Sequence, residues 1–526
     1  MMRASNRRLV AIPAIVIVTA VTCCRVESAR AESDAPVIGQ SLRYCNPLSL
    51  EASSQDGSPR GVSLGDVTVV REGNRYYMFC TGGGAWVSQD LVNWKYRPVQ
   101  GRVPVAPGVV KYHGYFYMSG NGAPLYRASD ILGPYEPVGD WKDHNGRPWT
   151  GTANNGRTWE GAFDVHFFID NDRPYLYYPG RGPEGVYVVP LDPEDLTQFA
   201  AAPKRLFGFD KSHRWERYGD MNEYSEVTWI EGPWMIKHGN TYYLEYSASG
   251  TQWLSYATGV YISRSPLGPF TYAPGNPILR KTTGVVTGPG HGCVVKGPDG
   301  HFWQFYTIVL ANPPGGRRIG MDPVGFDEKG NLFVRGPSET PQWAPGVVDD
   351  PARQGDSGSI PLTINKLRAM NARSTFSSQR TGHEAPYAID HSNGTWWEPA
   401  EDDEQPSLTL DLGPATEFDP VQRFMIDSCR IEFVAGRGRF GGRRGTPPPA
   451  NTTVAHQYKI EASTDGNTYT TVLDKTNNNI TKYAEFEEIP PTACRFVRLT
   501  MTAWPKVGSS NLGIMEFTVF GQPIEP

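Results

Sequence analysis

Three carboxylate residues each stand at the start of an apolar segment that is typical of a β-strand. Asp66 opens DVTVV, Asp164 opens DVHFF and Glu231 opens EGPWMI, and His291 opens HGCVV in the same way. Carboxyl groups that share one pocket repel one another and are partly desolvated, so at least one pKa should rise. Such a pair can cleave an acetal linkage, because one group protonates the leaving oxygen while the other activates water or attacks the sugar.

An internal repeat indicates how these residues could meet. A turn followed by an aromatic strand occurs five times, at GNRYYMF, HGYFYMS, NDRPYLY, GNTYYLE and DGHFWQF. Each copy continues with a further strand and turn. Repeated units of this kind predict an all-β fold, a five-bladed β-propeller; a β-sandwich with accidental similarity is the alternative. The composition agrees, with 57 Gly, 45 Pro and 26 Tyr in 526 residues.

The same repeat places the candidate residues on one axis. The repeat anchors are Tyr77, Tyr117, Tyr175, Tyr243 and Trp303, and the strand before each anchor starts at Asp66, Ala106, Asp164, Glu231 and His291. Because the innermost strand of each blade lines the centre of a propeller, we expect these five side chains around one funnel. A single aspartate at a strand start is usually a turn residue. Three carboxylates at equivalent positions favour a shared site instead.

Other side chains could serve the same funnel. Aromatic rings stack on sugar faces, and arginine binds hydroxyl and carboxylate groups. For each of these residues alone, packing between blades or surface charge is an equally good interpretation. Glu216, Glu223 and Glu226 are expected in a loop, from which one of them could enter the pocket. The candidates for substrate binding are His291, Trp86, Trp253, Tyr256, Arg317 and Arg318.

Over about residues 60–340 the ordered segments resemble glycoside hydrolase family 43 and its five-bladed relatives. The segments that carry the resemblance are GDVTVVREGNRYYMF, FDVHFFIDNDRPYLYY, EGPWMIKHGNTYYLEYSASG, SPLGPF and GPGHGCVVKGPDG. The resemblance implies that Asp66 is the general base, Glu231 the general acid, and Asp164 the residue that tunes and orients the acid. It also implies an inverting reaction and a position for His291 at the axis.

Two further implications concern metals and specificity. The resemblance implies no required cofactor, although it allows a structural or axial calcium that His291 touches directly or through water. The family usually has Asp-Pro where this sequence has Asp66-Val67 and Asp164-Val165. This difference bears on the sugar that is recognised more than on the chemistry.

A second domain is expected after a linker at 347–360, which is rich in Asp, Gly and Ser. Segments such as AIDHSNGTWWEP, SLTLDLG and CRFVRLTM resemble the discoidin or factor 5/8 type C fold, a β-sandwich jelly roll also found in carbohydrate-binding module family 32. Residues 436–453 form a basic insertion. Trp396, Trp397 and Trp504 are candidates for sugar contact, with core packing preferred for Trp396. The domain could equally be a passive cap on the propeller.

The first 31 residues are predicted to be a cleaved secretory signal. Arg3, Arg7 and Arg8 precede a short apolar stretch, and Ala29-Arg30-Ala31 fits a cleavage site. A membrane anchor or a lipoprotein signal are the alternatives. The predicted domains are therefore a signal at 1–31, a propeller at 32–346, a linker at 347–360 and a discoidin-like domain at 361–526. The protein is expected to be secreted or periplasmic, with no membrane contact after cleavage.

Net charge and cysteine spacing indicate which classes of ligand and cross-link to expect. The formal net charge is −5 for the whole chain, so a nucleic-acid partner is not expected. The cysteines beyond the signal show no zinc spacing. One disulfide, Cys429–Cys494, is the favoured pairing because both residues fall in the second domain. These cysteines are Cys45, Cys80, Cys293, Cys429 and Cys494.

We therefore expect a secreted glycosidase that acts on a plant or algal polysaccharide or oligosaccharide, of α-L-arabinofuranosidase or β-xylosidase type. A galactofuranosidase or an anhydro-galactosidase of a related propeller family is the nearest alternative. A non-catalytic carbohydrate-binding protein is a second class, which the complete set of Asp66, Asp164 and Glu231 disfavours. A propeller that binds a peptide or protein partner needs no carboxylate cluster. The oligomeric state is not predicted.

Overall fold

The computed structural model describes residues 42–52, 63–152, 158–160, 163–311, 316–348, 355–363, 374–413, 423–434, 455–505 and 512–524. These residues belong to one compact unit of the chain, which begins at Ser41. The predicted signal, the basic insertion at 436–453 and residues 349–354 of the predicted linker lie outside the described residues.

The described residues are almost entirely strands and loops, which confirms the all-β prediction. Helical structure among them is limited to three 3-10 turns, η1 (Gly182–Glu184), η2 (Arg214–Glu216) and η3 (Ala385–Ile389). In the described part of the chain none of these turns reaches the length and apolarity that a membrane crossing needs.

Five sheets follow one another in the N-terminal part, each an antiparallel meander of consecutive strands. Sheet 1 is β2 (Gly65–Glu72), β3 (Arg75–Thr81), β4 (Ala85–Ser88) and β5 (Lys95–Arg97). Sheet 2 is β6 (Gly108–Tyr112), β7 (Tyr115–Ser119), β8 (Leu125–Ala128) and β9 (Glu136–Gly139). Sheet 3 is β12 (His166–Asp170), β13 (Arg173–Pro179), β14 (Val186–Pro190) and β15 (Lys204–Phe207).

The remaining two sheets continue the pattern. Sheet 4 is β16 (Glu231–His238), β17 (Thr241–Ala248), β18 (Ala257–Ser263) and β19 (Thr271–Tyr272), with β20 (Leu279–Arg280) also paired to β18. Sheet 5 is β21 (Gly290–Lys296), β22 (Phe302–Leu310), β23 (Gly316–Phe326) and β24 (Leu332–Val334). Two small pairs lie outside these sheets, β10 (Thr150–Thr152) with β11 (Thr158–Glu160) and β1 (Arg43–Tyr44) with β25 (Gln342–Trp343).

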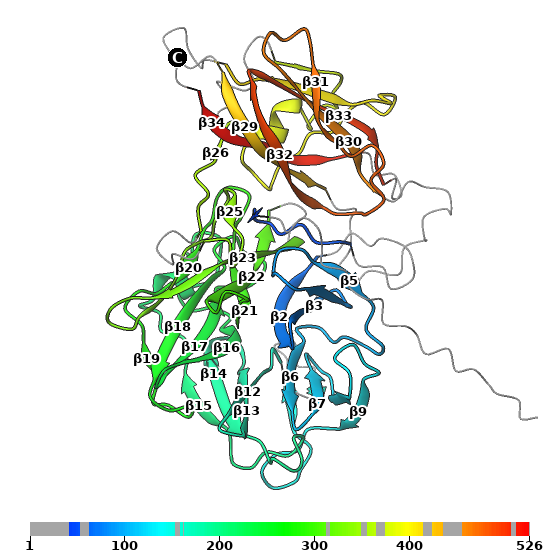
Figure 1. Cartoon of the computed structure of the whole chain (residues 1–526). Coiled ribbons are helices and arrows are strands. Elements are labelled where there is room, and N and C mark those ends of the chain that lie inside the picture. Colours follow the sequence, from blue (N-terminus) through cyan, green and yellow to red (C-terminus); the bar gives the residue numbers. More distant parts are fainter. Residues whose placement is uncertain are drawn as a thin grey trace, which may run out of the picture. The chain divides into compact units, whose positions relative to one another are not determined.

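The first strands of the five sheets contact one another in a closed cycle. Strand β2 contacts β6, β6 contacts β12, β12 contacts β16, β16 contacts β21, and β21 returns to β2. Figure 1 shows these strands toward the centre and β5, β9, β15 and β19 toward the outside. Five blades around one axis remain our interpretation of this arrangement.

Apolar packing closes the same cycle. One buried cluster lies between each pair of neighbouring sheets: Met78 of sheet 1 packs with Phe305 of sheet 5, and Leu244 of sheet 4 packs with Val188 of sheet 3. Three further clusters join sheets 1 and 2, sheets 2 and 3, and sheets 4 and 5. Because each sheet is covered on both faces, its strands are nearly continuously apolar, and polar groups at their ends stand out.

The C-terminal part forms two facing sheets around one core. One sheet has the order β26 (Ile360–Pro361), β34 (Ile514–Pro523), β29 (Phe424–Phe433) and β32 (Ala484–Cys494). The other has the order β27 (Thr375–Phe376), β28 (Ser407–Asp411), β33 (Phe496–Ala503), β30 (Gln457–Ser463) and β31 (Thr470–Asp474). Side chains of both sheets, such as Ile431 and Leu499, share one buried cluster, so this part is a β-sandwich.

The predicted disulfide is wrong. Cys429 and Cys494 are both free and buried, as are the other three described cysteines. In the pairing of β29 with β32, Cys494 lies opposite Phe424 and Cys429 lies opposite Glu487. The two sulfurs are therefore separated by five residues along the strands, roughly 17 Å, which no disulfide can span.

Candidate active site

A ring of unusual backbone conformation surrounds the axis. One residue at the start of each first strand has a positive φ: 54° at Asp66, 48° at Ala106, 44° at Asp164, 57° at Gly232 and 35° at His291. Residues other than glycine rarely adopt this conformation, and when they do the strain is often retained at functional sites. We call these five residues the axial ring.

The axial ring corrects one predicted equivalence. Gly232, and not Glu231, occupies the fourth ring position. In the strand register Glu231 lies opposite Ser247, as Gly65 lies opposite Thr81 and Gly290 opposite Thr307. Glu231 therefore corresponds to the residue before the ring. The ring residue lies twelve positions before its anchor in copy five and eleven positions before it in the other copies. Glu231 lies twelve positions before Tyr243, so the longer interval of copy five makes it look equivalent.

Polar side chains from the preceding sheet hold four of the five ring residues. The backbone N–H of Asp66 donates to Thr307 Oγ1 (2.9 Å) and that of Ala106 to Thr81 Oγ1 (2.8 Å). The N–H of Asp164 and of His291 donate in the same way to Asn121 Oδ1 (2.6 Å) and Ser247 Oγ (2.7 Å).

The four residues that accept these bonds were missed by the sequence interpretation. Thr81, Ser247 and Thr307 lie in the second strands of their sheets, the first two at or next to the strand ends and Thr307 within β22, and Asn121 follows β7. A small polar residue that recurs at the end of an apolar strand is the signal that could have revealed them.

Asp66 is held in its ionised form. Its Oδ1 lies 2.7 Å from Arg317 Nη1 and 3.2 Å from His291 Nδ1, and Thr81 Oγ1 donates to Oδ2 at 2.5 Å. Burial by itself would raise the pKa of Asp66. The Arg317 and His291 charges and the hydrogen bonds from His291 and Thr81 outweigh it and hold that pKa well below its usual range.

Arg317 reaches Asp66 because Gly65 leaves room for it. A Cβ at position 65 would lie 2.6 Å from the guanidinium carbon of Arg317. Arg317 is buried beside Asp66. This position agrees with the prediction that Arg317 belongs to the site, and the alternative that it is a surface charge is wrong.

The pKa values of Asp164 and Glu231 are shifted upward, in the opposite direction to that of Asp66. Burial raises the pKa of Asp164; it accepts hydrogen bonds from Asn121 Nδ2 (3.1 Å) and from the Gly232 N–H. Burial and the nearby Asp164 charge raise the pKa of Glu231 to about 7, although Tyr256 donates to its Oε1 at 2.7 Å. Glu231 is therefore protonated over much of the pH range in which Asp66 is ionised.

His291 links the two aspartates. Its Nδ1 lies 3.2 Å from Asp66 Oδ1 and 3.5 Å from Asp164 Oδ2. Burial alone would lower the pKa of His291. The charges of Asp164, Asp66 and Glu231 outweigh burial and raise it to about 9. The side chain is then an imidazolium at neutral pH that compensates part of the carboxylate charge.

The predicted aromatic candidates differ in position. Trp86 is fully buried between sheets 5 and 1, where its Nε1 donates to Glu51 O (2.9 Å), so the prediction that it binds substrate is wrong. Trp253 is half-buried and packs edge-on to Tyr218, with ring centroids 5.1 Å apart. Its role in substrate binding stays a prediction.

One aromatic pair adjoins the ring and was not predicted as a pair. Phe163 immediately precedes Asp164, and Trp229 lies two residues before Glu231. Their rings stack with centroids 6.4 Å apart, and both side chains are partly exposed. Such a surface suits the apolar face of a sugar.

The three glutamates expected in a loop differ in burial. Glu216 is buried, where it accepts hydrogen bonds from Tyr246 Oη (2.6 Å) and pairs with His213 Nδ1 (2.9 Å). Glu223 and Glu226 are exposed.

The three tryptophan candidates for sugar contact in the second domain pack in or against apolar clusters. Trp397 is fully buried in the sandwich core, so it is excluded as a sugar ligand. Trp396 is partly buried against the apolar cluster of sheets 4 and 5, which agrees with packing. Trp504 packs against the sandwich core.

The described residues offer no ready metal site. Among them no group of three or more His, Cys, Asp or Glu side chains is arranged to hold an ion. The Nδ1 of His291 already faces two carboxylates, whereas calcium needs six to eight oxygen ligands. The axial calcium stays a prediction, and no step below depends on a metal.

Asp66 of the axial ring is held ionised, and Glu231, next to the ring, is held protonated; an ionised and a protonated carboxyl group at one axis are what acid–base cleavage of a glycosidic bond needs. Comparison with known families agrees. The model of glycosyl hydrolases family 43 matches residues 62–332, more than half of the chain, so the chain belongs to this family. The model of the F5/8 type C domain matches residues 446–516. Both resemblances found in the sequence are thereby confirmed.

Individual relatives are more distant. The chain is 29% identical over 248 residues to the β-D-galactofuranosidase of Aspergillus niger, which covers 43% of this chain and 64% of that protein. It is 37% identical over 79 residues to a xylosidase/arabinosidase of Bacteroides ovatus, which covers 15% of this chain and 22% of that protein. The chain therefore spans less than two thirds of these curated relatives.

A solved structure of a thermostable family-43 glycoside hydrolase is 26% identical. It matches with a TM-score of 0.46 and covers 57% of this chain and 99% of that one.

Proposed function

We propose that this protein hydrolyses glycosidic bonds in plant or algal polysaccharide with inversion of the anomeric centre. The observation that carries the proposal is that two buried carboxyl groups at one axis have opposite surroundings: Asp66 lies 2.7 Å from Arg317 Nη1 and 3.2 Å from His291 Nδ1, whereas Glu231 lies near the Asp164 carboxylate. Arg317 and His291 hold Asp66 ionised, while burial beside Asp164 keeps Glu231 protonated up to a pH of about 7.

The two groups divide the chemistry. Glu231 donates its proton to the glycosidic oxygen, which leaves as an alcohol. Asp66 takes a proton from a water molecule as that water attacks the anomeric carbon from the opposite face. The reaction leaves Glu231 ionised and Asp66 protonated, and one proton transfer through solvent restores both.

Asp164 and Tyr256 serve the acid. The negative charge of Asp164 raises the pKa of Glu231, and Tyr256 fixes the direction of the Glu231 carboxyl group through its hydrogen bond. His291 spans the two aspartates and compensates their repulsion. The stacked Phe163 and Trp229 offer an apolar surface for the sugar ring.

For the sugar, we propose an α-L-arabinofuranoside or a β-D-xyloside, in line with the relative named xylosidase/arabinosidase. A β-D-galactofuranoside is the second candidate, because the relative of that name matches over a longer region of the chain. We also propose that the protein is exported, since its substrate is a polysaccharide.

The test is hydrolysis of three aryl glycosides (α-L-arabinofuranoside, β-D-xyloside and β-D-galactofuranoside) together with arabinan, xylan and red-algal polysaccharides. Release by the wild type and loss in Glu231→Gln are expected. Proton NMR of the first product formed should show the inverted anomer. Binding of polysaccharide by both proteins without release from any substrate would overturn the proposal in favour of a binding protein.

A further inference from the structure

Two neighbouring arginines of β23 face two different parts of the molecule. Side chains alternate along a strand, so Arg317 reaches Asp66 while Arg318 points the other way. Arg318 Nη2 donates to the carbonyl oxygen of Phe433 at 3.4 Å, and its guanidinium lies 5.8 Å from the ring centroid of Tyr483. Both partners belong to the sandwich. Arg318 Nη1 also donates to the carbonyl of Arg317 at 3.1 Å.

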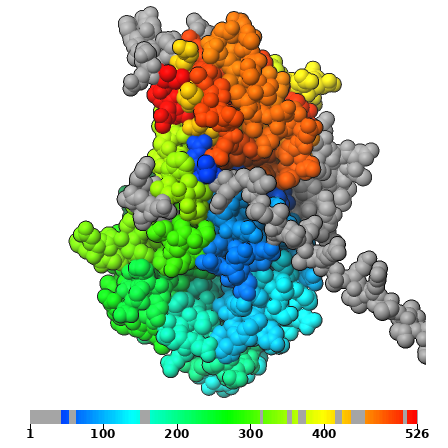
Figure 2. Space-filling model, in the orientation of Figure 1, coloured from blue at the N-terminus to red at the C-terminus, as the bar shows by residue number. Residues whose placement is uncertain are grey.

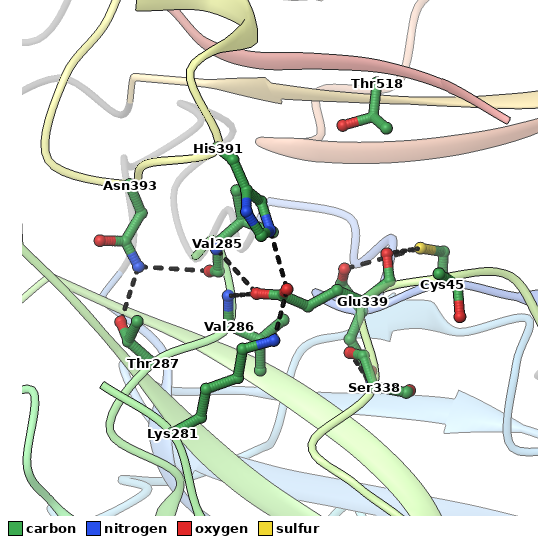
Figure 3. A network of polar contacts seen from close by, with 12 residues as sticks. Cys45, Lys281, Val285, Val286, Thr287, Ser338, Glu339, His391, Asn393 and Thr518 are labelled. Carbon is green, nitrogen blue, oxygen red and sulfur yellow. Dashed lines mark hydrogen bonds and ion pairs between the residues drawn. The ribbon is translucent and has the colours of Figure 1, made fainter. Parts of the chain in front are cut away.

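A second contact joins the sandwich to the segment that precedes His291. Asn393 Nδ2 donates to Thr287 Oγ1 (2.7 Å) and to Val285 O (3.2 Å), and Asn393 Oδ1 accepts from the N–H of Ala311 (3.0 Å). Figure 3 shows Asn393 and His391 reaching from the sandwich toward residues 285–287. Thr287 lies four residues before His291 on the same segment.

The same segment is held from its other side. Glu339 Oε1 accepts from the N–H groups of Val285 and Val286, both at 2.8 Å, while its Oε2 pairs with His391 Nε2 at 2.8 Å (Figure 3). Lys281 of the N-terminal part pairs with the same Oε2. The chain before His291 is therefore held from two sides, by Lys281 and Glu339 of the N-terminal part and by His391 and Asn393 of the sandwich.

The N-terminal residues complete this contact. Arg430 of β29 is fully buried and donates to the carbonyl oxygens of Asn46 (2.7 Å) and Glu339 (3.1 Å). Asn46 in turn donates to the Met321 carbonyl on β23 (2.9 Å). Figure 2 shows dark blue atoms of the segment at 42–52 between the yellow-green and orange parts.

We propose that the sandwich domain positions the residues of the axial ring. Arg318 and Asn393 are its positioning residues: they fix β23 and the segment at 285–291, so that Arg317 and His291 meet Asp66. The inference rests on the proposed function. It gives the F5/8 type C domain a role in the reaction that differs from sugar binding.

Burial explains why these contacts are specific. Arg318 is 7% exposed and Asn393 is 2% exposed. Removing such polar groups from water is costly. Arg318 bonds the backbone carbonyl of Phe433, and Asn393 bonds the backbone of Val285 and Ala311 together with Thr287 Oγ1, so each contact is satisfied in only one register. A displacement of about 1 Å in catalytic geometry can cost roughly a hundredfold in rate.

The test compares three variants of the full chain. Arg318→Met removes the guanidinium and keeps the stem, and Asn393→Ala removes the second contact. Arg498→Met is the matched control, because Arg498 pairs with Glu461 (2.9 Å) and lies over Tyr469 (3.9 Å), both within the sandwich. Thermal unfolding identifies any variant that fails to fold, in which case the other positioning variant is used.

Two readouts are measured. In Arg318→Met and Asn393→Ala we expect kcat to fall about ten- to a hundredfold with KM changed less than threefold, and partial recovery in Arg318→Lys. Hydrogen exchange followed by mass spectrometry should show faster exchange in peptides that contain the ring amides of Asp66 and His291. Arg498→Met should change neither.

The outcomes separate the two proposals. Unchanged kcat and unchanged exchange in the folded variants would overturn the positioning role, and so would a rise in KM with kcat preserved, because that is loss of sugar binding. If the wild type releases no sugar but exchange at the ring is accelerated, the positioning role holds and the proposed function fails.

Discussion

Carboxyl groups are buried both at the axis and at the contact between the N-terminal sheets and the sandwich, but only the axis has the geometry of an active site. The axial region contains Asp66, Asp164 and Glu231. The contact between the N-terminal sheets and the sandwich contains Glu339 and Glu432. Burial raises the pKa of Glu432 to about 7, as it does for Glu231, even though Arg430 lies 3.4 Å from Glu432. A raised pKa in a buried acid therefore does not identify a catalytic group.

The difference lies in how the charges are shared. At the contact Glu339 has its own partners: the hydrogen bond from His391 and the charge of Lys281 hold its pKa at about 2 against the effect of burial, and two backbone N–H groups donate to its Oε1. At the axis Arg317 pairs with Asp66 alone, and one imidazolium, His291, is shared between Asp66 and Asp164. Incomplete compensation leaves Glu231 protonated beside an ionised Asp66, which is useful for proton transfer and costs stability.

The largest effect should come from Glu231→Gln. Gln cannot donate the proton, so kcat should fall about 10²- to 10⁴-fold. The melting temperature should stay the same or rise, because the neutral amide avoids both the burial of a charge and the repulsion with Asp164. Steady-state kinetics and thermal unfolding measure both. An aryl glycoside with a strongly acidic leaving group should lose much less activity, and an equal loss on all substrates would argue against an acid role.

Glu339→Gln should instead reduce stability, by about 3 kcal/mol at pH 7, because Lys281 and His391 lose a buried partner. Glu339 has a folded pKa of about 2, below its usual 4.5. Its stabilisation is therefore complete above pH 4.5 and is lost as the pH falls through 2. Urea unfolding from pH 7 to pH 3 should show the gap between variant and wild type narrowing.

The control for that experiment is Glu226→Gln. Glu226 is 72% exposed and pairs with Lys211 at 3.4 Å, so its loss should cost less than about 1 kcal/mol. A gap for Glu339→Gln that widens at low pH would contradict the assigned ion pair.

Gly232→Ala should displace the neighbouring His291 side chain in the axial ring. The new Cβ would lie 2.8 Å from Cγ of His291, at a φ of +57°. We expect kcat to fall roughly tenfold because the His291 ring must move. Gly73→Ala has a similar φ of +60° with no atom within 4 Å, so it should lose about 1 kcal/mol of stability with kcat unchanged. Equal kcat in both variants would show that the clash is harmless.

The smallest effect is expected for Tyr256→Phe. The hydrogen bond from Tyr256 lowers the pKa of Glu231, so its loss should raise that pKa further above 7. Because Glu231 acts as an acid, activity falls as the pH rises through its pKa, and the basic limb of the kcat profile should move to higher pH. At pH 7 kcat should change less than about threefold. A shift of the limb to lower pH would contradict the assignment.

Much of this site is visible in the sequence because it depends on a repeat. Asp66, Asp164 and His291 could be found by their distance from an aromatic anchor, and all three lie on the ring. Glu231 was placed near the correct pocket but one position out of register. Hairpin length varies between copies, and only the pairing of Glu231 with Ser247 reveals the shift.

Other features could not be predicted, for identifiable reasons. Trp86 follows a glycine turn as a rim residue would, but which face of a strand is covered depends on the neighbouring sheet. The contact of Arg318 with Phe433 joins residues 115 apart. The free Cys429 and Cys494 depend on the register of two strands separated by more than fifty residues.

By itself, the sequence determined the all-β class, the repeated unit, the family and the kinds of groups at the axis. These follow from local periodicity and from residue types at recurring intervals, which any chain carries before it folds. Only the tertiary structure decided which carboxyl group is ionised, which is protonated, and how the sandwich reaches the ring. Those properties depend on burial and on distances of 2.5 to 3.5 Å between residues far apart in sequence, such as Arg317 and Asp66.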